Sequence, residues 1–276
     1  MHLYLPSYLS KRWRLRLQKL FSDPHTRALP KNHSLEDIFL VSFPKSGNTW
    51  VRFLVANAIK VKYQLDREVN FFSIHDIIPD AEISRNILAQ GPFGRCDLPR
   101  IVKSHTGFNP HYHRVILILR QPEDVMLSYY YFLKNYKNIP PDWTLSDFIR
   151  NPKTGITAWV RHTDSWLQPQ EIGQCLKVFT YEELKQDTAG QLGNMMSLLG
   201  LPLSADEQQQ AVALSSKDAM GTSEKQHMST QIIKQHETAF VRKAGTSRGA
   251  GLSPEDKQYI EQMTQPTLAR IKEQWL

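Results

Sequence analysis

The chain is poor in cysteine and contains no long apolar run. Its 276 residues include only two cysteines, Cys96 and Cys175, which are too few and too far apart in the sequence to indicate a disulfide framework. No run of about twenty apolar residues, the length that spans a bilayer, is present. The first 27 residues lack the uninterrupted apolar core of a signal peptide, because basic residues interrupt them. We therefore expect neither secretion nor a membrane span, and a cytoplasmic location.

The sequence also lacks internal repeats, low-complexity tracts and long linkers. With 41% hydrophobic residues, a chain of this length has enough apolar side chains for one core. Apolar runs typical of strands, near residues 38–43, 101–105, 114–119 and 175–180, alternate with helical patterns. This alternation predicts a single α/β domain in which a parallel β-sheet is flanked by helices.

Basic charge is concentrated at one end of the chain. The net charge is +7, but residues 1–27 hold six basic residues against one acidic residue, so the remainder carries only +2. We therefore predict a basic amphipathic segment over residues 1–27, a domain over residues 28–276 and no nucleic-acid partner. Two interpretations of the segment stay open. A helix packed on its own domain is the more common arrangement, and weak contact with an anionic membrane through residues 9–21 is the alternative.

An apolar run, a short turn and a helical pattern follow one another from Phe39 to Leu54. This order predicts a strand that feeds a helix through a phosphate-binding loop, since a helix N-terminus offers unpaired N–H groups and partial positive charge. Gly47 allows the backbone to approach an anion closely. Side-chain donors around it come from Lys45, Ser46, Asn48 and Thr49.

The spacing of this loop differs from that of the common ATP-binding loop. There the lysine follows the second glycine, whereas Lys45 stands two residues before the only glycine, Gly47. ATP is therefore not the expected ligand. A P-loop kinase, a non-catalytic binder of anionic nucleotides and a plain strand-turn-helix with a surface lysine stay open as alternatives.

A second segment, from Arg114 to Phe132, repeats the layout of strand, turn and helix. Arg120 stands at the end of the expected strand, and Ser128 lies about two helical turns later. Between the two segments, a short apolar strand ends in Lys103, Ser104 and His105. The carboxyl ends of parallel strands are where open α/β sheets bind ligands. His105 is thus a candidate for catalysis, although a lone histidine at a strand end is more often structural.

Together, these segments resemble the sulfotransferase family, whose members use the donor 3'-phosphoadenosine-5'-phosphosulfate (PAPS). Pro-Lys-Ser-Gly-Asn-Thr-Trp resembles the family's 5'-phosphosulfate loop, and Arg-x-Pro-x-Asp-Val-x-x-Ser-Tyr-Tyr resembles its 3'-phosphate motif. The resemblance is closest to the cytosolic small-molecule branch. It implies a P-loop-like fold, catalytic roles for His105, Lys45 and Ser128, and donor contacts from Lys45, Ser46, Gly47, Asn48, Thr49, Trp50, Arg120 and Ser128.

Four further donor contacts are implied by three weaker matches. Tyr181 ends a run similar to the family's strand near the adenine, and Ser216, which the sequence does not distinguish from Ser215, falls where the family often has a serine. Arg242 and Lys243 resemble the loop that closes over the 3'-phosphate. In that loop the chain departs from the family's pattern, because Ala244 stands where the family has glycine and Gly245 follows it.

The resemblance implies an in-line transfer in which His105 removes a proton from an acceptor hydroxyl or amine. Lys45 would neutralise the leaving oxygen, so that 3'-phosphoadenosine 5'-phosphate (PAP) is the product. We expect no metal, because no cysteine or carboxylate cluster completes a ligand set with His111 and His113. A small-molecule acceptor is expected, with a carbohydrate as the alternative. The oligomeric state is left open.

Overall fold

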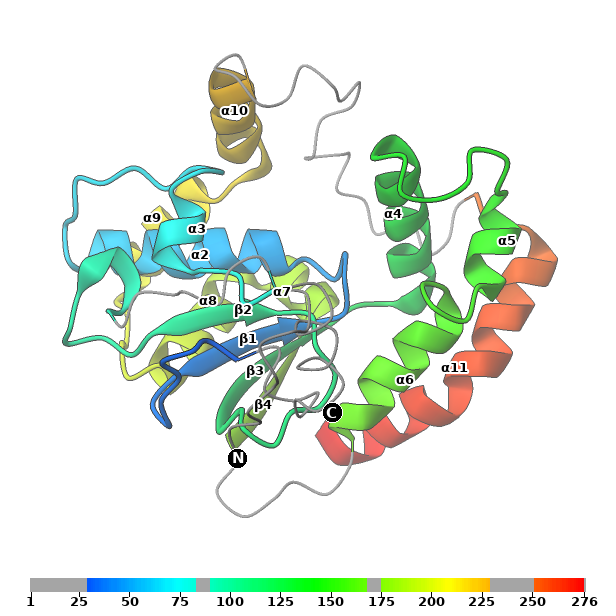
Figure 1. Cartoon of the computed structure of the whole chain (residues 1–276). Coiled ribbons are helices and arrows are strands. Elements are labelled where there is room, and N and C mark those ends of the chain that lie inside the picture. The colour runs from blue at the N-terminus through cyan, green and yellow to red at the C-terminus, as the bar shows by residue number, and fades with distance from the viewer. Residues whose placement is uncertain (1–28, 83–89, 168–174, 229–250, 276) are drawn as a thin grey trace, which may run out of the picture.

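The computed structural model describes residues 29–82, 90–167, 175–228 and 251–275. Four strands form one parallel sheet in the order β2-β1-β3-β4 (Figure 1). Their bounds are Ile38–Ser42 for β1, Ile101–Ser104 for β2, Arg114–Leu119 for β3 and Cys175–Thr180 for β4. The expected strands and the expected α/β class are therefore confirmed.

Helices cover both faces of the sheet, because the strands are apolar on both sides. On β1, Ile38 and Leu40 point into one core, shared with α2, α3, α8 and α9, while Phe39 and Val41 point into the other, shared with α4, α5, α6 and α11 (Figure 1). The helix bounds are α2 Asn48–Lys62, α3 Ile74–Ile77, α4 Pro122–Asn135, α5 Leu145–Arg150, α6 Ile156–Trp166, α7 Tyr181–Gln186, α8 Thr188–Leu198, α9 Ala205–Leu214, α10 Lys217–Met228 and α11 Pro254–Trp275, with a short 3-10 helix η2 at Pro92–Gly94.

The carboxyl ends of the four strands lie at one edge of the sheet. The loop containing Gly47 follows β1, His105 follows β2 and Arg120 follows β3. Tyr181, expected to close a strand, is instead the first residue of α7, directly after β4. Parallel strands thus place four predicted site residues on the same side of the molecule, as expected for ligand binding in an open α/β sheet.

Within the described ranges, we find no helix that combines the length and the apolar character needed to cross a bilayer.

Candidate active site

The loop after β1 presents the amino end of α2 at the edge of the sheet. Gly47 caps α2 with φ 97° and ψ 7°, and Lys45 also has a positive φ of 69°. No side chain caps the helix, and its first turn has no acidic residue. The first helical bond runs from the N–H of Val51 to the carbonyl of Gly47, so the N–H groups of Asn48, Thr49 and Trp50 have no acceptor within the helix. This end of α2 can therefore receive an anion.

Aromatic side chains pack tightly against this loop. A Cβ on Gly47 would lie 2.5 Å from Cδ2 of Tyr181, so only glycine fits here. The Tyr181 ring meets the Trp50 ring edge-on, with 5.6 Å between centroids. The indole N–H of Trp50 donates to the carbonyl of Ser215 at 3.2 Å. The fold thus brings the predicted positions Gly47, Trp50 and Tyr181 together, beside Ser215.

Ser215 and Ser216 differ sharply in their surroundings. The Ser215 side chain is fully buried, where its hydroxyl accepts from Asn57 at 3.0 Å and donates to the carbonyl of Ala211 at 2.8 Å. Ser216 is exposed, and its hydroxyl accepts from the N–H of Ala219 at the start of α10. Of the two, Ser216 has the accessible side chain, and its contact with a nucleotide stays a prediction.

Arg120 joins the two predicted binding segments. Its Nη1 donates to the carbonyl of Lys45 at 3.2 Å, and its guanidinium lies 4.4 Å from the centre of the Tyr181 ring. Nη2 lies 3.8 Å from Oδ2 of Asp124, one helical turn onward. The side chain is 13% exposed, and its buried Nε has no hydrogen-bond partner among the described residues. Part of this cation's capacity to donate hydrogen bonds is therefore unused.

Ser128 lies on the face of α4 that looks toward the loop after β1. Residues four apart share a helix face, so Asp124, Ser128 and Phe132 form one row. Asp124 pairs with Arg120 at one end of the row, while at the other the Phe132 ring centre lies 4.3 Å from Nζ of Lys45. Ser128 therefore lies in this row between the residues that contact Arg120 and Lys45, and its role stays a prediction.

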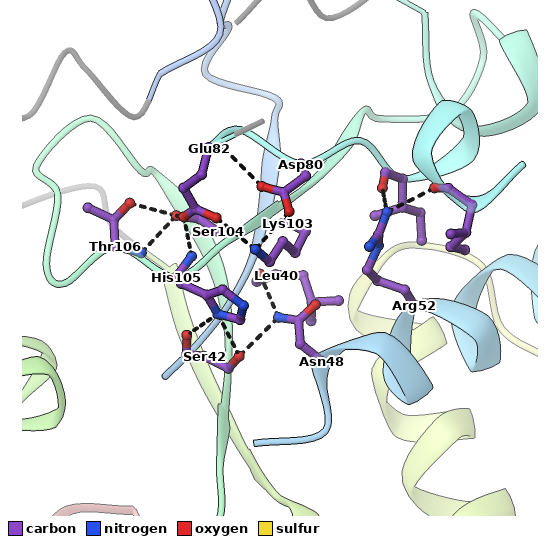
Figure 2. A network of polar contacts seen from close by, with 12 residues as sticks. Leu40, Ser42, Asn48, Arg52, Asp80, Glu82, Lys103, Ser104, His105 and Thr106 are labelled. Carbon is purple, nitrogen blue, oxygen red and sulfur yellow. Dashed lines mark hydrogen bonds and ion pairs between the residues drawn. The ribbon is translucent and has the colours of Figure 1, made fainter. Parts of the chain in front are cut away.

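The imidazole of His105 is held by the end of β1. Figure 2 shows Nδ1 of His105 directed at Ser42, 2.7 Å from its carbonyl oxygen and 3.3 Å from its hydroxyl. Asn48 donates to the same hydroxyl at 3.2 Å and to the carbonyl of Leu40 at 3.2 Å. Because a carbonyl can only accept, Nδ1 carries the proton and Nε2 carries the lone pair. Nε2 is thus the basic atom, and the ring is hydrogen-bonded to β1, the strand that directly precedes the loop containing Gly47.

Burial lowers the pKa of His105 to about 3, and the positive charge of Lys103 lowers it further, while the Ser42 carbonyl and Asp80 oppose the shift. The ring is therefore neutral at physiological pH, the state in which a base can accept a proton.

Two charged residues of the site were missed at the sequence level. The carboxylates of Asp80 and Glu82 accept hydrogen bonds from Nζ of Lys103 at 2.8 and 2.7 Å (Figure 2). Glu82 also accepts from the Ser104 hydroxyl and from the backbone N–H of His105. A lysine inside an apolar strand indicates a buried cation that needs a nearby carboxylate. The sequence does not reveal that this carboxylate comes from a segment more than twenty residues earlier.

His162 on α6 was also missed. It is buried, its ring meets the Phe43 ring edge-on at 5.6 Å, and burial lowers its pKa to about 4. Arg242 and Lys243, the predicted 3'-phosphate loop, lie outside the described residues, as does the segment 1–27.

Comparisons with known proteins identify the family of this chain. A family model described as the sulfotransferase domain matches residues 35–272. Sulfotransferase 2B1 of Mus musculus is 28% identical over 236 residues, covering 80% of this chain and 68% of that protein. Among solved structures, retinol dehydratase in complex with retinol and PAP has 16% identity and a TM-score of 0.62, covering 86% of this chain and 82% of that one. Mouse sulfotransferase SULT7A1 complexed with PAP has 17% identity and a TM-score of 0.57, covering 88% and 86%.

The chain therefore belongs to the sulfotransferase family, and it is a PAPS-dependent sulfotransferase. The structural neighbours, at these low identities, support its α/β fold. The kinase and the non-catalytic binder, both open at the sequence level, are set aside by this membership.

Proposed function

We propose that this enzyme moves the sulfuryl group of PAPS to a hydroxyl or amine of a small-molecule acceptor, with His105 as the general base. The observation that carries the proposal is the 2.7 Å contact between Nδ1 of His105 and the carbonyl of Ser42. It turns Nε2 into the proton acceptor and ties that atom to the strand whose next residues form the anion-binding loop. Base and donor loop are therefore held in one rigid frame.

The described residues fit an adenosine donor with two anionic groups. The amino end of α2 has no side-chain cap, and Nε of Arg120 is a buried donor without a hydrogen-bond partner among the described residues. We assign the 5'-phosphosulfate to the amino end of α2 with its flanking side chains, Lys45, Ser46, Gly47, Asn48 and Thr49. The adenine is assigned to Trp50 and Tyr181, and the 3'-phosphate to Arg120 and Ser128. Ser216, Arg242 and Lys243 stay predicted contacts of PAPS and of the product PAP.

When bound, PAPS supplies an activated sulfuryl group for in-line transfer. The protein's part is positioning and electrostatics, as in phosphoryl transfer. Nε2 of His105 accepts the acceptor's proton, which leaves the oxygen or nitrogen nucleophilic. A bound anion beside the ring would raise its pKa from about 3, since negative charge favours imidazolium. Lys45 balances the charge that develops on the leaving oxygen, and Ser128, between Lys45 and Arg120, directs the lysine. No step in this scheme calls for a metal.

The acceptor class is tested with sulfur-labelled PAPS and a panel of acceptors. A phenol, a primary alcohol, a hydroxysteroid, an aryl amine and a monosaccharide cover the two proposed nucleophiles and the carbohydrate alternative. Because one structural neighbour is described in complex with retinol, a long apolar alcohol joins the panel. Label in an apolar hydroxyl or amine compound supports the proposal. Label only in the monosaccharide would replace it with carbohydrate sulfation.

Location and boundaries follow from the sequence. We propose a cytoplasmic enzyme, on the basis of its low cysteine content, with a domain over residues 28–276 and a basic segment over residues 1–27. Sedimentation with anionic liposomes, with and without residues 1–22, tests whether that segment contacts membranes. Equal sedimentation of both forms would favour packing of the segment on its own domain.

A further inference from the structure

The strand that carries the base lies at the edge of the sheet. β2 pairs with β1 on one side only, and the residues just before Glu82 cover its other side. Asp80 forms a parallel bridge with Lys103, the N–H of Lys103 donates to the carbonyl of Pro79 at 2.8 Å, and the N–H of Ala81 donates to the carbonyl of Lys103 at 3.0 Å. The chain at Pro79, Asp80 and Ala81, directly before Glu82, is therefore attached to the base-bearing strand.

The Glu82 carboxylate contacts three consecutive residues of this strand end. Oε2 accepts from Nζ of Lys103 at 2.7 Å, while Oε1 accepts from the Ser104 hydroxyl at 3.0 Å and from the N–H of His105 (Figure 2). The Ser104 hydroxyl also accepts from Tyr112 at 3.1 Å. Its single hydrogen must point to Glu82, because a carboxylate cannot donate. The Ser104 hydroxyl is therefore the donor in its contact with Glu82.

Neutralising Lys103 does not explain this arrangement. Asp80, with a side chain only 8% exposed, already holds the same ammonium at 2.8 Å. The Glu82 side chain is 35% exposed, and its Oε1 contacts only Ser104 and His105 among the bonds described above. The second carboxylate therefore has a task beyond charge balance.

We propose that Glu82 is the positioning residue of the catalytic base: its carboxylate fixes the backbone and hydroxyl around His105, so that the imidazole stays on the Ser42 carbonyl with Nε2 toward the acceptor. The proposal rests on the proposed role of His105. Glu82 itself touches no reacting atom. Its loss is expected to release the strand end, after which the ring can turn and water can reach it.

Two variants of similar length separate positioning from charge. In Glu82→Gln the amide oxygen can still accept from Ser104 and the His105 N–H, whereas the ion pair with Lys103 is lost. In Glu82→Leu all three contacts are lost. If the role of Glu82 is positioning, Glu82→Gln should keep the His105 tautomer and the turnover that Glu82→Leu loses. If charge balance is the task, the two variants fail alike.

The main readout is the tautomer and titration of His105 in protein labelled with ¹⁵N-histidine, with the signal assigned by its loss in His105→Ala. The ionisable groups around this ring are Lys103, Asp80 and Glu82, together with His162 on α6. Wild type and Glu82→Gln should keep the Nδ1–H tautomer and stay neutral at pH 5. Glu82→Leu should give mixed tautomers and titrate closer to the ordinary value of about 6.5.

Turnover gives the second readout, measured with the acceptor that the labelled-donor screen identifies. Glu82→Leu should lower kcat by roughly 10- to 100-fold with the PAP Kd within about twofold, and Glu82→Gln should lower kcat by less than about fivefold. If Glu82→Leu fails to fold, Ser104→Ala, which removes one arm of the contact, should show the same tautomer change to a smaller degree.

The proposal would be overturned if Glu82→Leu kept the wild-type tautomer and kcat. It would also be overturned if Glu82→Leu and Glu82→Gln lost the tautomer and kcat to the same extent. The wild-type tautomer in a folded Ser104→Ala, when Glu82→Leu does not fold, would overturn it as well. Normal transfer by His105→Ala would instead remove the base assignment and leave the positioning of the ring to be judged by the tautomer alone.

Discussion

Two corners of the same sheet edge are built on opposite plans. At the donor corner, after β1 and β3, some hydrogen-bond donors are unused: the amino end of α2 has no side-chain cap, and Nε of Arg120 has no partner among the described residues. At the base corner, after β2, Lys103, the Ser104 hydroxyl and the His105 N–H are all bonded to Glu82.

The difference reflects what each corner does. Unused donors inside a protein are costly unless a ligand takes them up, so the donor corner is suited to receiving anionic oxygens. A ring that must present one nitrogen gains from partners that are already in place, so the base corner is suited to holding His105 still. Mutations should therefore separate the two corners: one set should affect binding, the other turnover.

The largest expected effect is that of His105→Ala. Removing a general base should lower kcat by roughly 10²–10⁴. The PAP Kd, measured by calorimetry, should stay within about twofold, because the donor corner is untouched. His113→Ala, in the turn before β3, serves as the control and should turn over normally. Comparable losses of PAP binding and kcat in His105→Ala would contradict the separation of the corners.

Arg120→Ala tests the donor corner. Loss of a charge-assisted contact should weaken PAP binding by roughly 10- to 100-fold, and the binding of AMP, which lacks the 3'-phosphate, by much less. The matched control is Arg114→Ala at the other end of β3, where the guanidinium pairs with exposed Glu36 at 3.6 Å. Calorimetry with both nucleotides gives the comparison. Equal weakening for PAP and AMP would remove the 3'-phosphate assignment from Arg120.

Gly47→Ala tests the packing of the donor loop. The substitution places a Cβ 2.5 Å from the Tyr181 ring at a φ of 97°, so the free energy of unfolding should fall by about 2–3 kcal/mol. Gly200→Ala also has a positive φ, of 75°, but no atom lies within 4 Å of its Cβ, so only backbone strain of about 1 kcal/mol is expected. Urea unfolding measures both. Equal losses would mean that Tyr181 does not press on the loop.

The smallest expected effect is the pH dependence of stability. The folded-state pKa of His105, about 3, lies below the unfolded value of about 6.5, so its contribution is full above pH 6.5 and is lost as pH falls toward 3. Between pH 7 and pH 5 this single group should contribute up to about 2 kcal/mol of the decline in unfolding free energy. Urea titrations at both pH values should show a smaller decline in His105→Ala. The same decline in both proteins would argue against burial of the neutral ring.

The sequence alone determined the α/β class, the four strands and the two anion-binding segments, because each is written in local patterns: apolar runs, a glycine before a helix, and a cation at a strand end. It also placed His105 after a strand, although the catalytic role came only from the family resemblance. For Tyr181, the sequence predicted the position and missed the element by one residue, since the strand-to-helix boundary depends on a capping box between Thr180 and Glu183.

Only the tertiary structure decided which nitrogen of His105 is basic, since that depends on the Ser42 carbonyl, 63 positions away. It also decided that Asp80 and Glu82 belong to the site, because a segment from before η2 comes to lie along an edge strand. Such contacts join residues far apart in the chain, and no local period or spacing encodes them. Local pattern therefore places the ligand-binding ends of the strands, and long-range packing sets the chemistry that those ends perform.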